Sequence, residues 1–584
     1  MRNTAFLWIA ALSLALSLMP ACATTGGGPA ASSVSAVPAA GLPPAHADQA
    51  YLHYMKGYLS EKDQEFQTAM SEYSAALTYD PDSPLLLVSM ARALMRQGRI
   101  NESVIYAEEA LRKDGKYVPA YMFLGALYSS AGRGDDAAAA YEKVVELDSG
   151  KDDAYLYLAN IYAGMDKHDK AVGILERYEK LNPGNVMAPY YMGRIYADKG
   201  DYDNALKYFQ KAAGLKPDFD MAKASIALVY EAKGDTGGAA SVYREMLSNN
   251  PSNLEVRARL ARLFLHDKRY DEALAEYEEL NKADPENVEV LTSMALIYTE
   301  QKQYDKAIEK FRAVLALKPG DNKTRYFIAA LYEEMEDYAG AKKEYEAVVD
   351  ADPSNMDATL RLAFVTEKAD GPGAAIDFLK DALTKNPGRF ELLLYLGATL
   401  TQNDRPSDAV EYLDQALEGA PHKDQVHFNL GVAYDKLKDW DRMVDEMKAA
   451  IDANPENAEA LNYLGYSFAD KGVWLDEALE LVNKAVKLSP DNGYYLDSLG
   501  WVYFKMGELD KAQAELQKAV DIEALDPVLR EHLGDVYLKM GMAGAAKAQW
   551  EKSLELGPDN EGLRKKYQES GFGAPPEAKE KPGV

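Results

Sequence analysis

Small, aromatic and proline residues recur along most of this chain at a spacing of 34 residues. Between consecutive prolines, stretches such as YMGRIYADKGDYDNALKYFQKAAGLKPDFD, from Tyr191, have the pattern of a helix, a turn and a second helix. The prolines stand at Pro183, Pro217, Pro251, Pro285, Pro319, Pro353, Pro387, Pro421 and Pro455, and then, one residue late, at Pro490. This internal period predicts one array of helical hairpins, although the length alone would suggest several domains.

One position in each predicted first helix is always small. The residues are Gly57, Ala91, Gly125, Ala159, Gly193, Ala227, Ala261, Ala295, Ala329, Ala363, Gly397, Gly431, Gly465, Gly500 and Gly534. A second position, about twelve residues later, is alanine in every repeat except those with Ser103 and Met443. Antiparallel helices approach closely only where the side chains at their crossing are small, so these positions predict the contact inside each hairpin.

A third position is aromatic in most repeats. Its residues include Tyr128, Tyr162, Tyr196, Tyr230, Phe264, Tyr298, Tyr332, Tyr434, Phe468, Tyr503 and Tyr537. These large side chains are expected to fill the space between neighbouring hairpins. Glycines such as Gly98 and Gly507 stand where the first helix should end, because a left-handed residue is favoured there.

This combination of small, aromatic and proline positions resembles the tetratricopeptide repeat family. The resemblance covers residues 50–557 and implies an all-α fold, a right-handed α-solenoid (superhelix) of about 15 helix-turn-helix repeats. The polar segment 558–570 is predicted to be a capping helix, and 571–584 a disordered tail. One extra residue, near Trp474, falls in a turn within a repeat and is expected to form a harmless loop.

The resemblance also implies an inner groove, lined mainly by the first helices, that binds protein or peptide partners. Aromatic and arginine residues at the groove positions are the candidate contacts, because such side chains often anchor interfaces. The candidates are Tyr157, Tyr190, Tyr191, Arg194, Arg259, Arg262, Tyr326, Phe327, Arg361, Tyr395, Phe428, Asn429, Tyr463, Tyr466 and Trp501. Two binding modes known in the family, a carboxylate clamp and an asparagine ladder, are not supported. Leu156 and Tyr191 replace clamp residues, and Asn429 alone fits the ladder.

The first 21 residues are predicted to be an export signal, with a basic start at Arg2 and an apolar run from Phe6 to Met19. Cys22 is the only cysteine of the chain, and its surroundings resemble a bacterial lipobox. We therefore expect a lipid on Cys22, a flexible tether over 22–49 and anchorage in the outer membrane, facing the periplasm. The alternative is ordinary cleavage at Ala21-Cys22-Ala23, with no lipid.

The net charge and the cysteine and histidine content of the chain exclude several classes of function. The formal net charge of −28 argues against nucleic-acid binding, which needs clustered basic residues. A single cysteine leaves no intrachain disulfide, and seven scattered histidines suggest no metal or catalytic site. We therefore predict no enzyme activity, no cofactor, no metal and no small-molecule substrate, and contact with the membrane only through the lipid anchor.

The leading hypothesis is a non-enzymatic scaffold or adaptor. The segment from Ala460 to Ala512 is similar to one common in exported bacterial repeat proteins. Some lipoproteins with this layout hold a periplasmic C-terminal processing protease and deliver its substrates. The alternative is an assembly component of an envelope export system for exopolysaccharide, pili or outer-membrane proteins. The repeats do not separate these choices.

Overall fold

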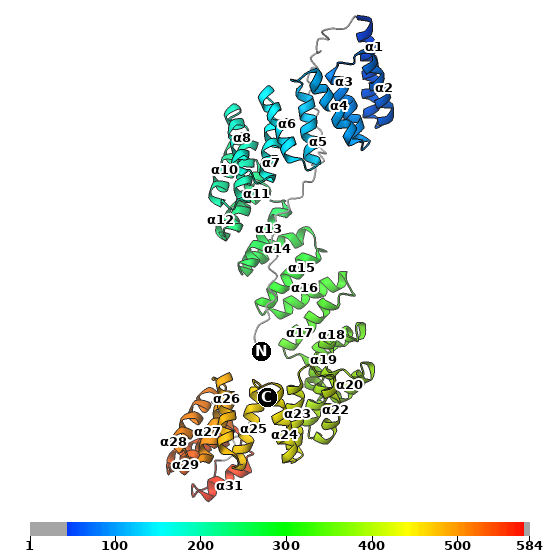
Figure 1. Cartoon of the computed structure of the whole chain (residues 1–584). Helices are drawn as coiled ribbons and strands as arrows, with labels where there is room; N and C mark the ends of the chain where they lie inside the picture. The colour runs from blue at the N-terminus through cyan, green and yellow to red at the C-terminus, as the bar shows by residue number, and fades with distance from the viewer. Residues whose placement is uncertain (1–43, 577–584) are drawn as a thin grey trace. The chain divides into compact units, whose positions relative to one another are not determined.

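The computed structural model describes residues 44–576, which form helices joined by short turns (Figure 1). The first thirty helices are fifteen consecutive antiparallel pairs, and a shorter helix follows them. The predicted all-α repeat architecture is confirmed. The contacts divide the chain after Asn249 into two units, α1–α12 and α13–α31, each described by itself.

In the first unit, every odd-numbered helix is the first of its pair and packs on the even-numbered helix that follows. The first helices are α1 (Pro44–Lys62), α3 (Pro84–Arg96), α5 (Val118–Ser130), α7 (Asp152–Gly164), α9 (Met187–Asp198) and α11 (Asp220–Ala232). The second helices are α2 (Phe66–Tyr79), α4 (Ile100–Lys113), α6 (Gly134–Leu147), α8 (His168–Leu181), α10 (Tyr202–Leu215) and α12 (Thr236–Asn249).

The second unit repeats this arrangement nine times. Its first helices are α13 (Leu254–His266), α15 (Val288–Glu300), α17 (Asn322–Glu334), α19 (Met356–Asp370), α21 (Phe390–Gln402), α23 (Lys423–Lys436), α25 (Ala458–Lys471), α27 (Gly493–Met506) and α29 (Pro527–Lys539). Its second helices are α14 (Tyr270–Ala283), α16 (Tyr304–Leu317), α18 (Tyr338–Ala351), α20 (Pro372–Lys385), α22 (Pro406–Gly419), α24 (Trp440–Ala453), α26 (Leu475–Leu488), α28 (Leu509–Ile522) and α30 (Ala543–Leu556), and α31 (Glu561–Glu569) ends the unit.

Where the small position of a first helix is glycine, it faces a bulky side chain of its own second helix. A Cβ atom added at Gly193 of α9 would lie 2.7 Å from the Phe209 ring, closer than real Cβ contacts. Gly125 stands in the same relation to Tyr141, whose nearest ring atom would be 2.7 Å away. The glycine therefore lets an aromatic ring lie flat against the backbone of the partner helix, which closes the hairpin.

The turns between hairpins are held by side-chain caps. In the Pro-x-Asn turns, the asparagine side chain accepts a hydrogen bond from a backbone N–H three residues later, which belongs to the first turn of the next helix. Asn253 does this for α13 at 3.1 Å, and Asn457 for α25 at 3.0 Å. At the other end of a first helix, Gly507 has φ +83°, a conformation that glycine adopts easily. Proline, asparagine and glycine thus set the helix boundaries within each repeat.

The extra residue of the 35-residue repeat lies in the turn between α25 and α26. Gly472 ends α25 in a left-handed conformation, and Trp474, the residue before α26, is also left-handed with φ +45°. The indole of Trp474 packs edge-on against Phe468, with ring centroids 4.8 Å apart, and the residue remains 55% exposed. The insertion is a short loop, and both helices keep their places in the array.

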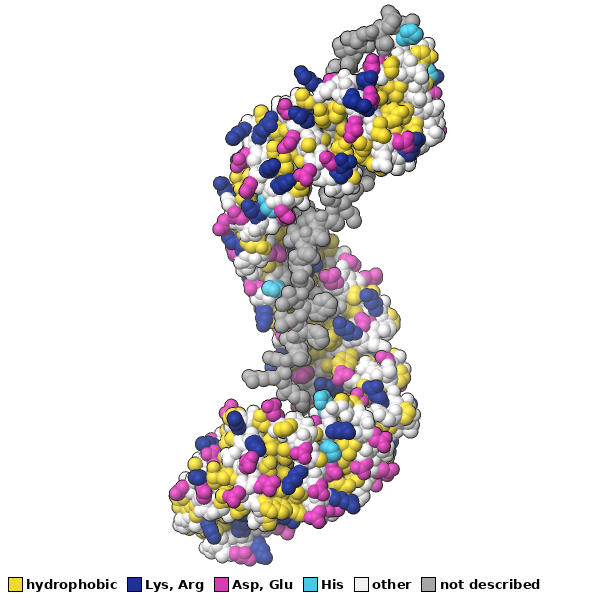
Figure 2. Space-filling model, in the orientation of Figure 1, with side chains coloured by type: hydrophobic (Ala, Val, Ile, Leu, Met, Phe, Trp, Pro, Cys, Tyr) yellow, Lys and Arg dark blue, Asp and Glu magenta, His cyan; other side chains and the backbone are white. Residues whose placement is uncertain are grey.

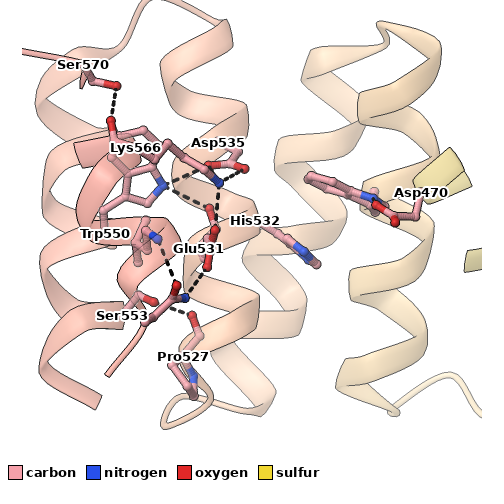
Figure 3. Close-up of polar contacts among 12 residues, drawn as sticks. Asp470, Pro527, Glu531, His532, Asp535, Trp550, Ser553, Lys566 and Ser570 are labelled. Atoms are coloured by element: carbon pink, nitrogen blue, oxygen red, sulfur yellow. Dashed lines mark hydrogen bonds and ion pairs between the residues drawn. The ribbon is translucent and has the colours of Figure 1, made fainter. Parts of the chain in front are cut away.

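A polar network joins α31 to the last repeat (Figure 3). Lys566 Nζ lies 2.7 Å from Glu531 Oε1 and 2.7 Å from Asp535 Oδ2, both on α29. Trp550 Nε1 of α30 donates to Asp535 Oδ1 at 3.0 Å, and Asn560 donates to Glu531 Oε2 at 2.8 Å. Burial raises the pKa of Asp535, and the ammonium of Lys566 opposes that effect. This network and the buried Leu563 and Tyr567 hold α31 against the final hairpin.

Two boundaries differ from those expected. Helix α1 begins at Pro44, six residues before the predicted start of the array, so the segment between Cys22 and the first helix is shorter than predicted. At the other end, part of the predicted disordered tail is packed. Phe572 lies edge-on to Trp550 and Tyr567, and Arg564 Nη1 donates to the carbonyl oxygen of Pro576. Its aromatic ring explains why Phe572 packs in a segment that is otherwise polar and proline-rich.

Several predictions lie outside the described residues. These are the export signal over 1–21, the lipid on Cys22, most of the tether and the tail beyond residue 576.

The contact between Gly193 and Phe209 generates a test of the packing account. We expect Gly193→Ala to destabilise the first unit by about 1–3 kcal/mol, because the added methyl group must displace a buried ring. Gly173→Ala, in the middle of α8, is the matched control, since no atom lies near its added Cβ. It should be neutral or stabilising by up to about 1 kcal/mol. Thermal unfolding and hydrogen exchange across α7–α10 measure both variants, and equal effects would contradict the account.

Candidate functional site

The first helices form the inner layer of each unit. Several neighbouring first helices touch directly. In the first unit the contacts join α1 with α3, α3 with α5 and α7 with α9. In the second unit they join α19 with α21, α21 with α23, α25 with α27 and α27 with α29. Among the described residues, no two successive second helices make comparable contacts. The hairpins therefore converge on the first-helix side, and side chains there can reach a partner across several repeats.

Four predicted groove residues lie on α7 and α9 of the first unit. Tyr157 is 47% exposed, with its ring 5.5 Å from that of Tyr141, and Arg194 lies over the ring of Tyr191 at 5.3 Å. Tyr190 is only 8% exposed, since its ring packs against those of Tyr191, Phe209 and Phe219. Tyr190 therefore belongs to the core, whereas Tyr157 presents its ring to solvent.

Arg259 and Arg262 of α13 lie beside carboxylates. Arg259 is 3.3 Å from Glu255 on its own helix, and Arg262 is 3.5 Å from Glu289 on α15. Arg259 is partly exposed and the other three side chains are largely exposed, so these ion pairs contribute little to stability. The two arginines can exchange these partners for a ligand at small cost.

A denser cluster joins α17, α18 and α19. Arg361 Nη1 donates to Glu333 Oε1 at 2.8 Å, and the hydroxyl of Tyr345 donates to the other oxygen of the same carboxylate at 3.1 Å. The hydroxyl of Tyr326 donates to Asp357, and its ring lies edge-on to that of Tyr345 with centroids 5.2 Å apart. The Arg361 side chain remains partly open to solvent, since 52% of it is exposed. The carboxylates fix the arginine and the tyrosines in place.

The electrostatics of this cluster favour neutral tyrosines. Burial, followed by the hydrogen bond to Asp357, raises the pKa of Tyr326 to about 12. Burial and the nearby charge of Glu367 raise the pKa of Tyr395 on α21 to about 12. Both hydroxyl groups therefore stay protonated in the physiological range and can donate hydrogen bonds. Phe327 instead stacks on Phe311 at 5.7 Å, which uses one face of its ring.

The predicted residues on α23 and α25 are half-buried. The rings of Phe428 and Tyr463 meet edge to face at 6.0 Å, and the hydroxyl of Tyr463 donates to Asp435 Oδ2 at 3.0 Å. Asn429 donates to the carbonyl oxygen of Gln425 on its own helix at 2.8 Å. Burial, followed by the charge of Asp470, raises the pKa of Tyr466 to about 12.

Trp501 of α27 is 8% exposed and lies against a buried histidine. Its indole stacks on the imidazole of His532 with centroids 4.2 Å apart, and its Nε1 donates to Asp470 Oδ1 at 3.4 Å. His532 Nδ1 donates to Asp497 at 2.9 Å, and both of these residues are buried. In Figure 3, His532 points from α29 toward the side of the helix that carries Asp470. Trp501 therefore braces neighbouring repeats, and its exposed edge is small.

The predicted groove residues were aromatic residues, arginines and one asparagine, and the carboxylates of these clusters were not among them. Glu333, Asp357, Asp435 and Asp497 each pair with a side chain from the inner layer. The pairs Glu333–Arg361 and Asp497–His532 are separated by 28 and 35 residues, close to one repeat. Opposite charges or hydrogen-bonding groups about one repeat apart are the sequence signal that could have found them.

The described surface carries no dominant charge patch on the visible face. Figure 2 shows basic and acidic side chains interspersed over both units, with hydrophobic side chains between them. Among residues 44–576, no three His, Cys, Asp or Glu side chains come together as a metal site. None of the helices in that range is both long and apolar enough to span a membrane.

The buried His532 generates a prediction about pH. Burial, the largest influence, lowers its pKa, but the carboxylates of Asp497, Asp535 and Glu531 together outweigh burial and raise the pKa above the ordinary value. The stabilisation by this pair is therefore complete below about pH 6.5, the usual histidine value, and is lost as the pH rises through the raised pKa. Hydrogen exchange in α27–α29, measured as the pH is raised, should show increasing opening. Asp497→Asn should flatten that dependence, and a profile equally steep in the variant would contradict the assignment.

Models of known families match several parts of this chain. Models described as Tetratricopeptide repeat match residues 88–154, 230–297, 298–359, 396–443, 428–493 and 494–524, together more than half of the chain. A model described as Anaphase-promoting complex, cyclosome, subunit 3 matches residues 130–212.

Individual proteins are similar over shorter stretches or at low identity. The TPR repeat-containing protein PA4667 of Pseudomonas aeruginosa is 42% identical over 82 residues, 14% of each chain. This chain thus spans about a seventh of the length of the curated relatives it matches. In the solved APC/C hetero-tetramer Cut9–Hcn1, a chain is 14% identical with a TM-score of 0.37, over 84% of this chain and 98% of that one. The thermophilic TPR protein TTC0263 of Thermus thermophilus is 26% identical with a TM-score of 0.29, over 32% of this chain and 100% of its own.

The repeat models agree with the hairpin array in both units. They follow the same period that places small residues opposite large ones in successive hairpins. The chain belongs to the tetratricopeptide repeat family, and its fold is that of a protein-protein interaction scaffold.

Proposed function

We propose that this chain is an adaptor anchored to the bacterial outer membrane through a lipid on Cys22, and that it binds protein partners along its first helices. The observation that carries the proposal is the cluster of Tyr326, Arg361 and Tyr395 on successive first helices. Glu333 holds Arg361 and Asp357 holds Tyr326, and the Arg361 side chain remains partly open to solvent. Such a surface suits an extended protein segment, because it offers contacts at repeated intervals along one face.

Preorganisation supports this choice. A long arginine side chain normally loses rotamer freedom when it binds, which weakens affinity. Arg361 is already fixed by the hydrogen bond to Glu333, and Tyr326 by its hydrogen bond to Asp357. Binding a partner here therefore orders few additional side chains. Tyr157 in the first unit offers a similar exposed ring, steadied by Tyr141.

Membrane anchorage would supply the mechanism of an adaptor. A lipid on Cys22 would confine the repeats to a thin layer next to the bilayer. Two proteins bound to the same array, such as a protease and its substrate, would then meet at a raised effective concentration. No catalytic group of the adaptor is required for that effect, which depends on geometry alone.

The direct experiment is purification of the native chain from membranes under mild detergent, followed by mass spectrometry. The proposal predicts a lipid-modified Cys22 at the N-terminus, together with a co-purifying protease or cell-wall hydrolase. Subunits of an envelope export channel in stoichiometric amounts would favour the alternative function, that of an assembly component. An unmodified N-terminus would overturn the lipid anchor.

A pair of arginine variants tests the binding surface with whichever partner is purified. Arg361→Ala should weaken binding about tenfold or more, because it removes an anchoring side chain from the inner layer. Arg442→Ala is the matched control, since this arginine is 65% exposed on the second helix α24. Its affinity should stay within about twofold of the parent chain. Isothermal titration measures both values, and equal weakening, or none, would contradict this placement of the site.

A further inference from the structure

The outer face of α1 exposes apolar side chains that are covered in later repeats. Leu52 is 47% exposed and Leu59 is 55% exposed. Leu86, Leu392 and Leu529 occupy the repeat position of Leu52, and Leu127, Ile297 and Val502 occupy that of Leu59. Each of these six is at most 5% exposed. The preceding hairpin covers these positions in later repeats, and no described element precedes α1.

The other faces of α1 are already occupied. Helices α2 and α3 pack against it from one side. Glu61 accepts hydrogen bonds from Arg92 at 2.5 Å and from Tyr73 at 2.8 Å, and His53 pairs with Glu72 at 2.6 Å. The acidic group in the second half of α1 is therefore turned toward the repeats. The outer face of α1 is therefore distinct from the face that carries this acidic group.

That outward face combines apolar, aromatic and cationic groups. Tyr51 is 64% exposed beside Leu52 and Leu59. Lys56 lies between the two leucines in sequence and is exposed, and among the described residues it makes no ion pair. Near the end of the helix, Lys62 lies over the ring of Tyr58 at 5.1 Å. Leucine, tyrosine and lysine on one helix face are the combination that suits the boundary between lipid tails and headgroups.

The two ends of the array differ in this respect. At the C-terminal end, α31 buries Leu563 and Tyr567 against the last hairpin and presents polar groups outward. The outward face of α1 keeps Leu52 and Leu59 exposed, and no described helix covers them. A polar helix thus covers one end of the array, whereas the other end exposes apolar side chains.

We propose that the outer face of α1 docks on the phospholipid bilayer that holds the lipid of Cys22. This inference rests on the proposed lipid anchor and departs from the expectation that the chain contacts the membrane only through that anchor. Only residues 23–43 separate Cys22 from Pro44, and 21 residues span at most about 75 Å, so α1 is the described helix nearest to the proposed anchor along the chain. Leu52, Leu59 and Tyr51 would enter the headgroup region, and Lys56 would meet lipid phosphates.

Charge favours the bilayer over a second copy of the chain. A two-fold pairing of this face with itself would bring two Lys56 ammonium groups into one contact, which is unfavourable. Phosphate groups of lipids give the same ammonium a complementary partner. Because α2 and α3 lie on the opposite side of α1, docking would direct the following repeats away from the membrane and leave their inner layer open.

The test uses the lipidated chain reconstituted in vesicles of phosphatidylethanolamine and phosphatidylglycerol. Cys22 is the only cysteine, and its thiol is consumed by the lipid, so an introduced cysteine can be labelled alone. A bimane label on Leu59→Cys should be quenched at least about twofold by nitroxide-labelled lipids. The control is Leu525→Cys, because Leu525 is 78% exposed in the turn before α29, far along the chain from the anchor. It should show no quenching.

Three outcomes overturn the inference. Equal quenching at both sites, or at neither, on a chain whose Cys22 is shown by mass spectrometry to be lipidated, overturns docking while leaving the anchor intact. An emission shift of the label at residue 59 that grows with protein concentration and persists in detergent, without quenching by the nitroxide-labelled lipids, shows that a second copy covers the face. An unmodified Cys22 removes the anchor and the inference together. In the supporting case, adding Leu52→Asp to the labelled chain should abolish the quenching at residue 59.

Discussion

The structure depends on one steric constraint, the close approach of two helices at a residue without a bulky side chain. At Gly57, Gly125 and Gly193 the backbone of the first helix touches an aromatic ring of the second, and a Cβ there would fall 2.7 Å from ring atoms. The ring stays buried because nothing stands between it and the opposing backbone. The other surfaces of a hairpin closed in this way pack against the neighbouring hairpins. The hydrophobic core therefore extends along the array, and each repeat contacts mainly the next.

The same geometry explains where polar side chains are needed. Because first helices converge, carboxylates and cations about one repeat apart meet on the inner layer, as Glu333 does with Arg361 and Asp497 with His532. These contacts join neighbouring hairpins and also fix the side chains that a partner would touch. At the C-terminal end Lys566 completes the series by pairing with Glu531, which lets α31 close the array. The contacts that join the repeats and the proposed contacts with a partner thus lie on one surface.

The array could be predicted from the sequence because its defining contacts repeat at a fixed spacing. The small residues, the capping asparagines and the turn glycines act locally, so their positions along the chain determine the helices. The exposure of the candidate groove residues was less predictable. Tyr190 and Trp501 have groove spacing, yet Phe219 and His532 from other helices cover them, and burial by a neighbouring helix cannot be read from one repeat. The start of α1 at Pro44 was missed because residues 44–49 lack the small and aromatic signature.

Hydroxyl-radical footprinting of the native chain, with and without its purified partner, tests most directly the claim that the first helices are the binding layer. Aromatic side chains are oxidised readily when exposed, so protection reports contact. The account predicts that protection on binding falls on Tyr157, or on Tyr326 and Tyr395, and leaves Trp474 in the turn after α25 unchanged. Protection confined to Trp474 and to side chains of the second helices, with the inner layer still oxidised, would contradict it.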